Sequence, residues 1–289
     1  MKSMKLSVII PVYNEEETVG QVIAGLKEEL NKIGLEYEII AVNDGSTDKS
    51  KEILEKISGL RLINHPYNKG NGASVKTGAK NAKFDWLLTF DADGQHKPEY
   101  IKEFIKYSDQ YDMITGWRQG YKGPFIRQPG KKMLHLIANY LVERKIPDLN
   151  CGFRLLKRDL FLKYEHLLPD GFYCTTSILT FLKEGLNVKY VPIYINKRIR
   201  GKSSVKISDG FRTIMLVVRL IMLFSPLKIF MPIAMAGFIV SLAMMAYIMI
   251  QTHFDMISKS GGFLFVASLL IFLFGLLADQ VAAIRRHLQ

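Results

Sequence analysis

Two aspartates one residue apart, Asp91 and Asp93, directly follow the apolar run "WLLTF" of residues 86–90. A carboxylate pair at the end of a buried strand suits three kinds of site: a calcium-binding loop, an acid–base dyad, or a metal site for a phosphorylated ligand. A calcium loop needs glycine at its sixth position and glutamate at its twelfth. Counted from Asp91, glycine stands fourth and Lys102 stands twelfth, so the calcium interpretation fails.

Carboxylates two residues apart on a strand point to opposite faces unless the chain turns between them. If the strand ends at Asp91 and the chain turns through Ala92, both carboxylates can approach one ion. A divalent ion bridged to a diphosphate explains the pair best, because Mg²⁺ is usually held by one or two carboxylates together with phosphates. An acid–base dyad and a turn closed by aspartate side chains stay open as alternatives.

The elements that must position this pair alternate along the first 205 residues. Amphipathic segments rich in Lys and Glu separate the strand-like runs, an order typical of an α/β fold with a parallel sheet and helices on both faces. The strand-like runs cover residues 6–13, 37–44, 60–64, 86–93 and 112–117.

Polar clusters follow four of these strands: "PVYNEE", "NDGSTD", "NKGNG" and "DADGQ". In open sheets of this class, ligands bind at the carboxyl ends of the strands, where the strand order reverses. We therefore expect the four clusters to lie in one layer and to form one site.

The segment "GNGASVKTG", residues 70–78, looks like a phosphate-binding P-loop. That motif requires glycine directly before the lysine, and Val75 stands there instead. The pattern predicts a Gly-rich turn that leads into a helix. Two interpretations stay open: the first N–H groups of the helix face an anion, or the glycines only provide a flexible backbone.

Two apolar runs near the C-terminus are long enough to cross a bilayer. Ile229–Ile250 is a run of 22 residues without a charge, and a second run extends from Gly261 to Ala278, or to Ile284 if Asp279 lies near the interface. A buried core helix is the alternative. Two such runs joined by a short polar loop predict a transmembrane hairpin over residues 228–289, with spans of about 229–250 and 261–284.

The connecting loop of the hairpin contains one lysine, whereas Lys and Arg flank its other ends. By the positive-inside rule this predicts a multi-pass cell-membrane protein whose N-terminal domain and C-terminus are cytoplasmic. Cys151 and Cys174 lack metal-ligand spacing and fit reduced thiols. Arg212 and Arg219 share one helical face, which predicts an amphipathic interfacial helix over residues 206–227 rather than a third span.

With these features assembled, the chain resembles the family 2 glycosyltransferases of the GT-A fold, in their polyprenyl-phosphate (dolichyl-phosphate mannose synthase-like) branch. The resemblance implies a GT-A catalytic domain over residues 1–205, built on a Rossmann-like, mostly parallel sheet. It also implies an enzyme that transfers a sugar from a UDP- or GDP-sugar to a polyprenyl (dolichyl or undecaprenyl) phosphate. The motifs that carry it are "PVYNEE", "NDGSTD", "NKGNGASVKTG", "DADGQHKPE", "DLNCGFR" and "RIRGKSS".

The resemblance implies a nucleotide pocket lined by Pro11, Tyr13 and Glu15, with Asp44 on the base or ribose. Asn43 stands where the family more often has a second acid. It further implies that Asp91, Asp93 and Gln95 hold Mg²⁺ or Mn²⁺ against the diphosphate. The loop that closes over this diphosphate would contribute Arg198, Lys202 and Ser203.

For the acceptor, the resemblance assigns Arg118 and Arg127 to the lipid phosphate, with Lys131 as a weaker candidate; Asp93, Arg118 and Arg127 are then the catalytic residues. Chemistry supports these assignments, because two phosphorylated substrates at one site must be neutralised by metal and by Arg or Lys. Arginine suits the task because its planar fork matches phosphate geometry.

Two other functions compete with this one. A transferase with a hydroxyl acceptor would need a carboxylate base, yet "FYCTTSILTF", residues 172–181, contains no acid. Asp148 and Asp170 flank that stretch, and a cap or turn is the expected role of each. The third candidate is a non-catalytic nucleotide-binding membrane scaffold. None of these functions involves nucleic acid, and each leaves a homo-oligomer open.

Overall fold

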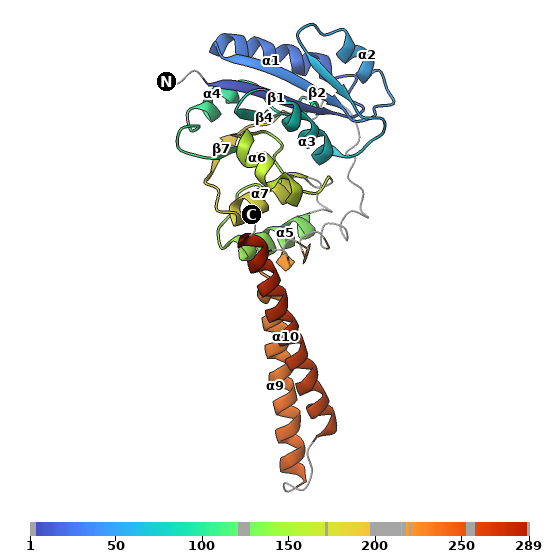
Figure 1. The fold of residues 1–289 in the computed structure, drawn as a ribbon, viewed down its shortest axis with the longest axis vertical. Coiled ribbons are helices and arrows are strands. Elements are labelled where there is room, and N and C mark those ends of the chain that lie inside the picture. The colour runs from blue at the N-terminus through green and yellow to red at the C-terminus, as the bar shows by residue number, and fades with distance from the viewer. Residues whose placement is uncertain are drawn as a thin grey trace. The chain divides into compact units, whose positions relative to one another are not determined.

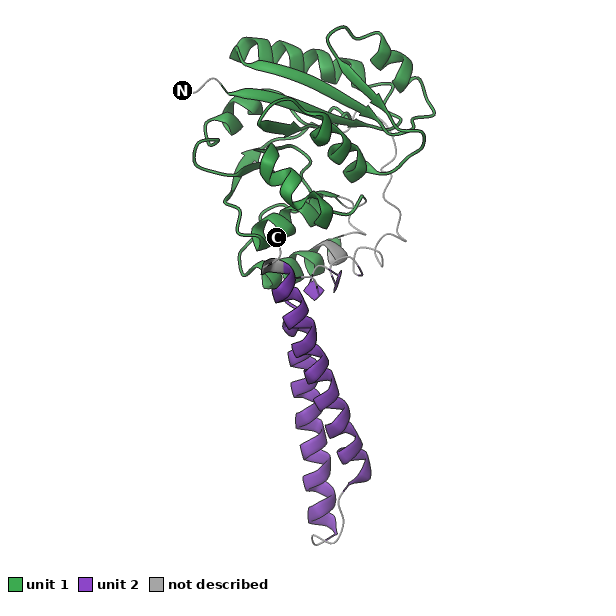
Figure 2. Ribbon diagram, viewed as in Figure 1, with its two compact units in different colours: residues 1–210 green, residues 211–289 purple. Residues whose placement is uncertain are grey.

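The computed structural model describes residues 4–120, 128–170, 173–196, 215, 218–219, 221–222, 224–252 and 258–287 (Figure 1). They belong to two compact units, residues 1–210 and residues 211–289 (Figure 2). The first unit contains a sheet with its helices, and the described part of the second contains two long helices.

The first unit alternates strands and helices, as the sequence predicts. Its elements are β1 (Lys5–Val12), α1 (Val19–Ile33), β2 (Glu36–Asn43), α2 (Ser50–Glu55), β3 (Arg61–Asn64), α3 (Asn71–Asn81), β4 (Trp86–Thr89), α4 (Tyr100–Ile105), β5 (Met113–Arg118), α5 (Gln128–Val142), β6 (Arg154–Lys157), α6 (Arg158–Tyr164), the 3₁₀ helix η2 (Glu165–Leu167), α7 (Tyr173–Lys183) and β7 (Val188–Ile193).

The seven strands among the described residues form one sheet in the order β3-β2-β1-β4-β6-β5-β7. Only β6 is antiparallel to its neighbours, β4 and β5, so the predicted mostly parallel α/β sheet is confirmed. The five predicted strands are all present. Sequence analysis missed β6 and β7; β6 gave little signal because it is a four-residue run that begins with a charged arginine.

Side chains on β1 alternate between the two faces of the sheet. Leu6, Val8 and Ile10 belong to a buried cluster together with residues of α1, while Ile9 points to the opposite face, where it meets Gly78 of α3. Figure 1 shows α1 along one face of the sheet and α3 and α6 on the other. With helices covering both faces, the exposed ends of the strands are where a ligand can bind.

The second unit is a hairpin of α9 (Leu227–Gln251) and α10 (Lys259–His287). Small residues let the two helices approach closely: a Cβ atom on Gly237 would collide with Ser268, and one on Gly275 would lie 3.1 Å from Phe230 Cγ. Ser241 Oγ also donates to the carbonyl oxygen of Gly261, at 2.8 Å. Packing through small and hydroxyl side chains is typical of helices in an apolar surrounding.

The predicted interfacial helix over residues 206–227 falls mostly outside the described residues and stays a prediction.

Candidate functional site

The loops that follow β1 and β2 are joined by hydrogen bonds. Asn14 adopts a positive φ of 54°, which places its Oδ1 2.8 Å from the Thr47 N–H, while its own N–H donates to Ser46 Oγ at 3.1 Å. The N–H of Glu15 donates to Ser50 Oγ at 2.9 Å. The "PVYNEE" and "NDGSTD" clusters therefore form one surface at the carboxyl end of the sheet.

The third cluster is attached through Asp44, whose side chain is buried. Its Oδ1 accepts from His65 Nδ1 at 2.7 Å and from the Lys69 N–H at 2.9 Å, and its Oδ2 accepts from the Gly70 N–H at 2.8 Å. His65 Nε2 in turn lies 2.9 Å from Thr77 Oγ1 on α3. Asp44 thus holds the loop that starts α3, and its assigned contact with the base or ribose stays a prediction.

The predicted turn into a helix at Gly70 is confirmed, because α3 begins at Asn71. The first turn of α3 is partly engaged by the protein itself, since the Gly72 N–H donates to the carbonyl oxygen of Asp170 at 2.8 Å. An anion at this helix terminus would have to use other N–H groups.

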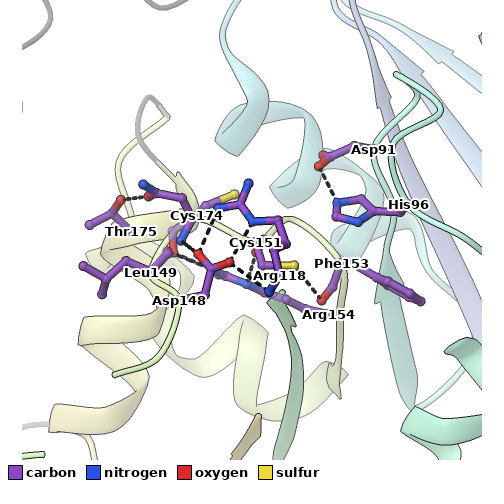
Figure 3. A network of polar contacts seen from close by, with 11 residues as sticks. Asp91, His96, Arg118, Asp148, Leu149, Cys151, Phe153, Arg154, Cys174 and Thr175 are labelled. Carbon is purple, nitrogen blue, oxygen red and sulfur yellow. Dashed lines mark hydrogen bonds and ion pairs between the residues drawn. The ribbon is translucent and has the colours of Figure 1, made fainter. Parts of the chain in front are cut away.

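The fourth cluster, which contains the aspartate pair, is tied to the first. Thr18 Oγ1 donates to the carbonyl oxygen of Ala92 at 2.7 Å, and the Gln95 N–H donates to Asp93 Oδ1 at 3.1 Å. Asp91 Oδ2 lies 3.2 Å from Nε2 of the buried His96 (Figure 3). The chain does turn through Ala92, as the metal interpretation requires.

A glycine makes room for Asp91. A Cβ atom on Gly152 would lie 2.7 Å from Asp91 Oδ1 and closer still to Oδ2. The Gly152 carbonyl oxygen accepts a 2.6 Å hydrogen bond from Thr89 Oγ1 at the end of β4. The segment before β6 is thereby held directly against the aspartate loop.

The donor set fits a divalent ion shared with a ligand. Among the described residues, no group of three or more His, Cys, Asp or Glu side chains is arranged to hold a metal. An ion at Asp91 and Asp93 would complete its shell with ligand oxygens, as Mg²⁺ does when it is bound through one or two carboxylates and phosphates. Bound there, the ion would neutralise negative charge on such a ligand.

Asp91 is kept ionised by its surroundings. Burial acts to raise its pKa, but the hydrogen bond from His96 and the positive charges of Arg118 and Arg154 act against burial, and the pKa lies below its usual value. An ionised carboxylate is the form that binds a metal ion.

Arg118, at the end of β5, is held by a buried carboxylate. Its Nε and Nη2 donate to Asp148 at 2.7 and 2.9 Å, and the side chains are 13% and 6% exposed. Asp148 also accepts from the N–H groups of Arg118 and Asn150. The expected turn role of Asp148 is therefore only part of its function, since the carboxylate mainly orients the Arg118 guanidinium (Figure 3).

The remaining predicted residues fall into two groups. At the end of β1 and in the loop that follows it, Pro11 and Glu15 are half-buried and Tyr13 is 41% exposed. The ring of Tyr13 is therefore accessible to a ligand. Five others lie outside what the structure describes, and their roles stay predictions: Arg127, Arg198, Lys202 and Ser203, together with the Lys131 side chain.

Both cysteines are free thiols, as predicted. Burial raises the pKa of Cys151 to about 12 and that of Cys174 to about 11. Burial therefore disfavours the thiolate, which is the reactive form of cysteine.

Sequence reasoning gave no role to several residues of this site. His65 gave no signal, because isolated polar residues of this type occur throughout any chain. Thr77 and His96 lie within the quoted motifs "NKGNGASVKTG" and "DADGQHKPE". Gly152 and Arg154 lie within the quoted motif "DLNCGFR", which could have directed attention to them.

Comparison with known proteins defines the class. Residues 7–164, more than half of the chain, match the family model described as glycosyl transferase family 2, and residues 225–284 match the one described as GtrB C-terminal hairpin. The chain therefore belongs to glycosyltransferase family 2 and is an enzyme of that family, as its motifs predict.

Three similar proteins extend this result. An uncharacterized protein of Methanocaldococcus jannaschii is 32% identical over 201 residues, 65% of this chain and 80% of that protein. An uncharacterized glycosyltransferase of Synechocystis is 33% identical over 54% of this chain. The undecaprenyl-phosphate 4-deoxy-4-formamido-L-arabinose transferase of Proteus mirabilis is 30% identical over 55% of it. The chain spans about half the length of the last two, 51% of each.

Solved structures agree on the fold. Glucosyl-3-phosphoglycerate synthase from Mycobacterium tuberculosis, in complex with Mn²⁺, UDP and phosphoglyceric acid, superposes with a TM-score of 0.60 at 18% identity, covering 74% of this chain and 77% of that one. Mannosyl-3-phosphoglycerate synthase from Rubrobacter xylanophilus gives 0.62 at 16% identity, covering 75% and 73%. The predicted GT-A fold is confirmed.

Proposed function

We propose that the protein is a membrane-anchored inverting glycosyltransferase that moves a sugar from a UDP- or GDP-sugar to a polyprenyl phosphate. The Proteus mirabilis relative, an undecaprenyl-phosphate sugar transferase by name, supports this acceptor. So does the match of residues 225–284 to a hairpin model. The observation that carries the proposal is that the Asp148 carboxylate is already fully engaged in hydrogen bonds.

A hydroxyl acceptor needs a base to remove its proton, whereas a phosphate monoester with a second pKa of about 6 is largely ionised at neutral pH. The Asp148 carboxylate already accepts four hydrogen bonds, from Arg118 and from the Asn150 N–H. Asp170 is ion-paired with Lys76 at 2.9 Å. The two late acids that could act as a base therefore have other partners, which favours an acceptor that needs no base.

In this proposal, Asp91 and Asp93, with Gln95 beside them, hold Mg²⁺ or Mn²⁺ against the donor diphosphate. Pro11, Tyr13, Glu15 and Asp44 form the nucleotide pocket. Arg118, fixed in direction by Asp148, binds the acceptor phosphate and aims its oxygen at the anomeric carbon. The remaining cationic and polar residues are assigned to phosphate oxygens: Arg127 and Lys131 on the acceptor side, and Arg198, Lys202 and Ser203 on the donor side.

The hairpin supports a membrane anchor. Leu227–Gln251 and Lys259–Arg285 have mean hydropathies of 2.3 and 2.5, yet only 11% and 17% of their most apolar windows are buried. A core helix of a globular protein would be mostly buried, and a helix that is apolar all round yet exposed belongs in lipid. Placing the catalytic domain and the C-terminus in the cytoplasm rests on the distribution of Lys and Arg.

The test uses the full chain in detergent with Mn²⁺ or Mg²⁺, a panel of UDP- and GDP-sugars, and either a polyprenyl phosphate or the matching free polyprenol. We expect mass spectrometry to detect a glycosylated lipid phosphate and no product from the alcohol. Efficient transfer to the alcohol or to a soluble sugar would favour the hydroxyl-acceptor function. Nucleotide binding without turnover on any acceptor would favour the scaffold.

A matched pair of variants tests the acceptor site. Arg118→Ala should raise the acceptor KM or lower kcat far more than Asp170→Asn does, because Asp170 is 58% exposed in its side chain and pairs with a lysine of α3. An inactive Asp170→Asn beside an active Arg118→Ala would show that a carboxylate base is used.

A further inference from the structure

Arg154, the first residue of β6, is the largest fully buried side chain among the described residues, with 0% exposure. Oxygen atoms surround its guanidinium. Nε donates to the carbonyl oxygen of Cys151 at 2.8 Å, and Nη2 donates to those of Leu149, at 3.4 Å, and Cys174. Nη1 donates to Ser177 Oγ. None of the ion pairs among the described residues includes Arg154.

A buried charge that forms no direct ion pair is costly, and a fold that needed only packing at this position could use an apolar residue. Arginine is the cation best suited to such a place, because its guanidinium is weakly hydrated and its five N–H donors lie in a rigid plane. The donors of Arg154 are used to bind main-chain oxygens from two separate segments. This arrangement indicates that Arg154 holds the two segments in a fixed position relative to each other.

The first of the two segments is residues 148–152. It carries Asp148, which orients Arg118, and Gly152, which packs against Asp91. Its Asn150 Oδ1 also accepts a hydrogen bond from Thr175 on α7. The acceptor arginine and one metal carboxylate are thus both supported by the segment whose carbonyl groups Arg154 binds.

The second segment is the N-terminal part of α7, which contributes the carbonyl oxygen of Cys174 and the hydroxyl of Ser177. Figure 3 shows Arg154 with the 148–153 segment and Cys174 around it. Register places Arg154 opposite Thr89 of β4 and Thr115 of β5, and Thr89 Oγ1 donates to the Gly152 carbonyl oxygen. A polar row therefore runs under the site from β4 to β5.

We propose that Arg154 is a positioning residue for the acceptor side of the reaction: it fixes residues 148–152 against α7 and thereby sets the direction of Arg118. The acceptor readout rests on the proposed function. A positioning residue far from the substrate can still govern the rate, because a displacement of about 1 Å in a reacting group can cost about 10²-fold.

The test compares Arg154→Lys and Arg154→Met with Arg158→Met in the full chain. Arg158 is a matched control, since it lies four residues further on, is half-buried and donates to a carbonyl oxygen, that of Ala79, on α3. We expect Arg154→Lys to bind UDP or GDP within about 3-fold of wild type and to lose about 10²-fold in kcat/KM for polyprenyl phosphate. Arg154→Met should lose at least as much, and Arg158→Met should lose little.

Hydrogen–deuterium exchange gives a readout that does not depend on turnover. Amides of residues 148–153 and 173–178 should exchange faster in Arg154→Lys than in wild type, and those of α1 should not change. If wild type transfers no sugar to polyprenyl phosphate, the proposed function fails while this comparison still tests Arg154.

The proposal would be overturned if Arg154→Lys folds and keeps the wild-type kcat/KM for polyprenyl phosphate. It would also be overturned if the variant loses nucleotide affinity by as large a factor as it loses kcat/KM. If neither Arg154 variant folds, Ser177→Ala takes their place, because it removes the hydroxyl that accepts a hydrogen bond from Arg154 Nη1. It should lower the same kcat/KM without changing nucleotide affinity, and an unchanged kcat/KM would contradict the positioning role.

Discussion

Gly152 and Asp91 lie so close together that a Cβ atom on the glycine would stand 2.7 Å from Asp91 Oδ1, a distance that real Cβ atoms essentially never show. The two residues are 61 positions apart in the chain and come from the loops before β6 and after β4. The antiparallel pairing of these two strands brings the loops together. The Asp91 carboxylate therefore packs directly against the main chain of Gly152, and only a residue without a side chain leaves room for it there.

Gly152→Ala should displace the Asp91 carboxylate and lower metal-dependent turnover by about 10²-fold or more, as the loss of one preorganised charged group does. The fold should persist, because the clash is with a half-exposed side chain rather than with the backbone. Apparent Mn²⁺ affinity and kcat measure the effect. Gly20→Ala is the control, since its Cβ would make only an ordinary 3.6 Å contact; equal activity in both variants would contradict the assignment.

Asp93→Asn should remove most turnover together with its dependence on a divalent ion, because the amide keeps the shape of the side chain but loses the charge that would hold the metal. A loss of about 10²-fold or more is expected. Circular dichroism should show a folded protein. A near-native rate in the presence of EDTA would rule out the metal site at the aspartate pair.

The pKa of Asp148 is lowered in the folded protein. Burial acts to raise it, but the hydrogen bonds and charge of Arg118, with the N–H of Asn150, outweigh burial. A carboxyl group of this kind stabilises the fold above its unfolded pKa, and this stabilisation is lost as the pH falls through the folded pKa.

Asp148→Asn should therefore lower the free energy of unfolding near pH 7 by about 3–5 kcal/mol, the usual cost of breaking a buried ion pair. Its Tm should also fall less steeply than that of wild type as the pH drops below about 4. Thermal unfolding at a series of pH values measures both effects. Asp109→Asn, at an exposed position, serves as control, and parallel Tm profiles for wild type and Asp148→Asn would refute the prediction.

In the hairpin, Gly237→Ala should separate α9 from α10, because the added Cβ would collide with the Ser268 side chain. Gly262→Ala should be tolerated, since its Cβ would meet only the flexible end of Met245 at 3.7 Å. Thermal unfolding of the two variants in detergent makes the comparison. An equal Tm for both would show that close approach at Gly237 does not stabilise the hairpin.

Local patterns in the sequence were sufficient for the alternating α/β order, the five predicted strands and the two apolar C-terminal helices. Each of these depends on residues near one another in the chain, whose spacing directly reflects which face is buried. The aspartate pair could also be singled out, because Asp91 and Asp93 follow a strand end at a spacing that suits one ion, and its role as a metal site stays a prediction. Nothing comparable marked β6, a short strand whose first residue is a buried arginine.

Only the tertiary structure determined the contacts between segments that are distant in the sequence. Asp148 could be read in the sequence as a turn residue or a base, and its four hydrogen bonds, two of them from the Arg118 side chain, depend on how β5 lies beside the segment before β6. Asp44 could be assigned to a nucleotide, yet its partners in the fold include His65, on a neighbouring strand end. Hydrogen bonding and burial depend on surroundings that are assembled from remote parts of the chain. The sequence therefore identifies the candidate residues, and the fold determines which of them meet.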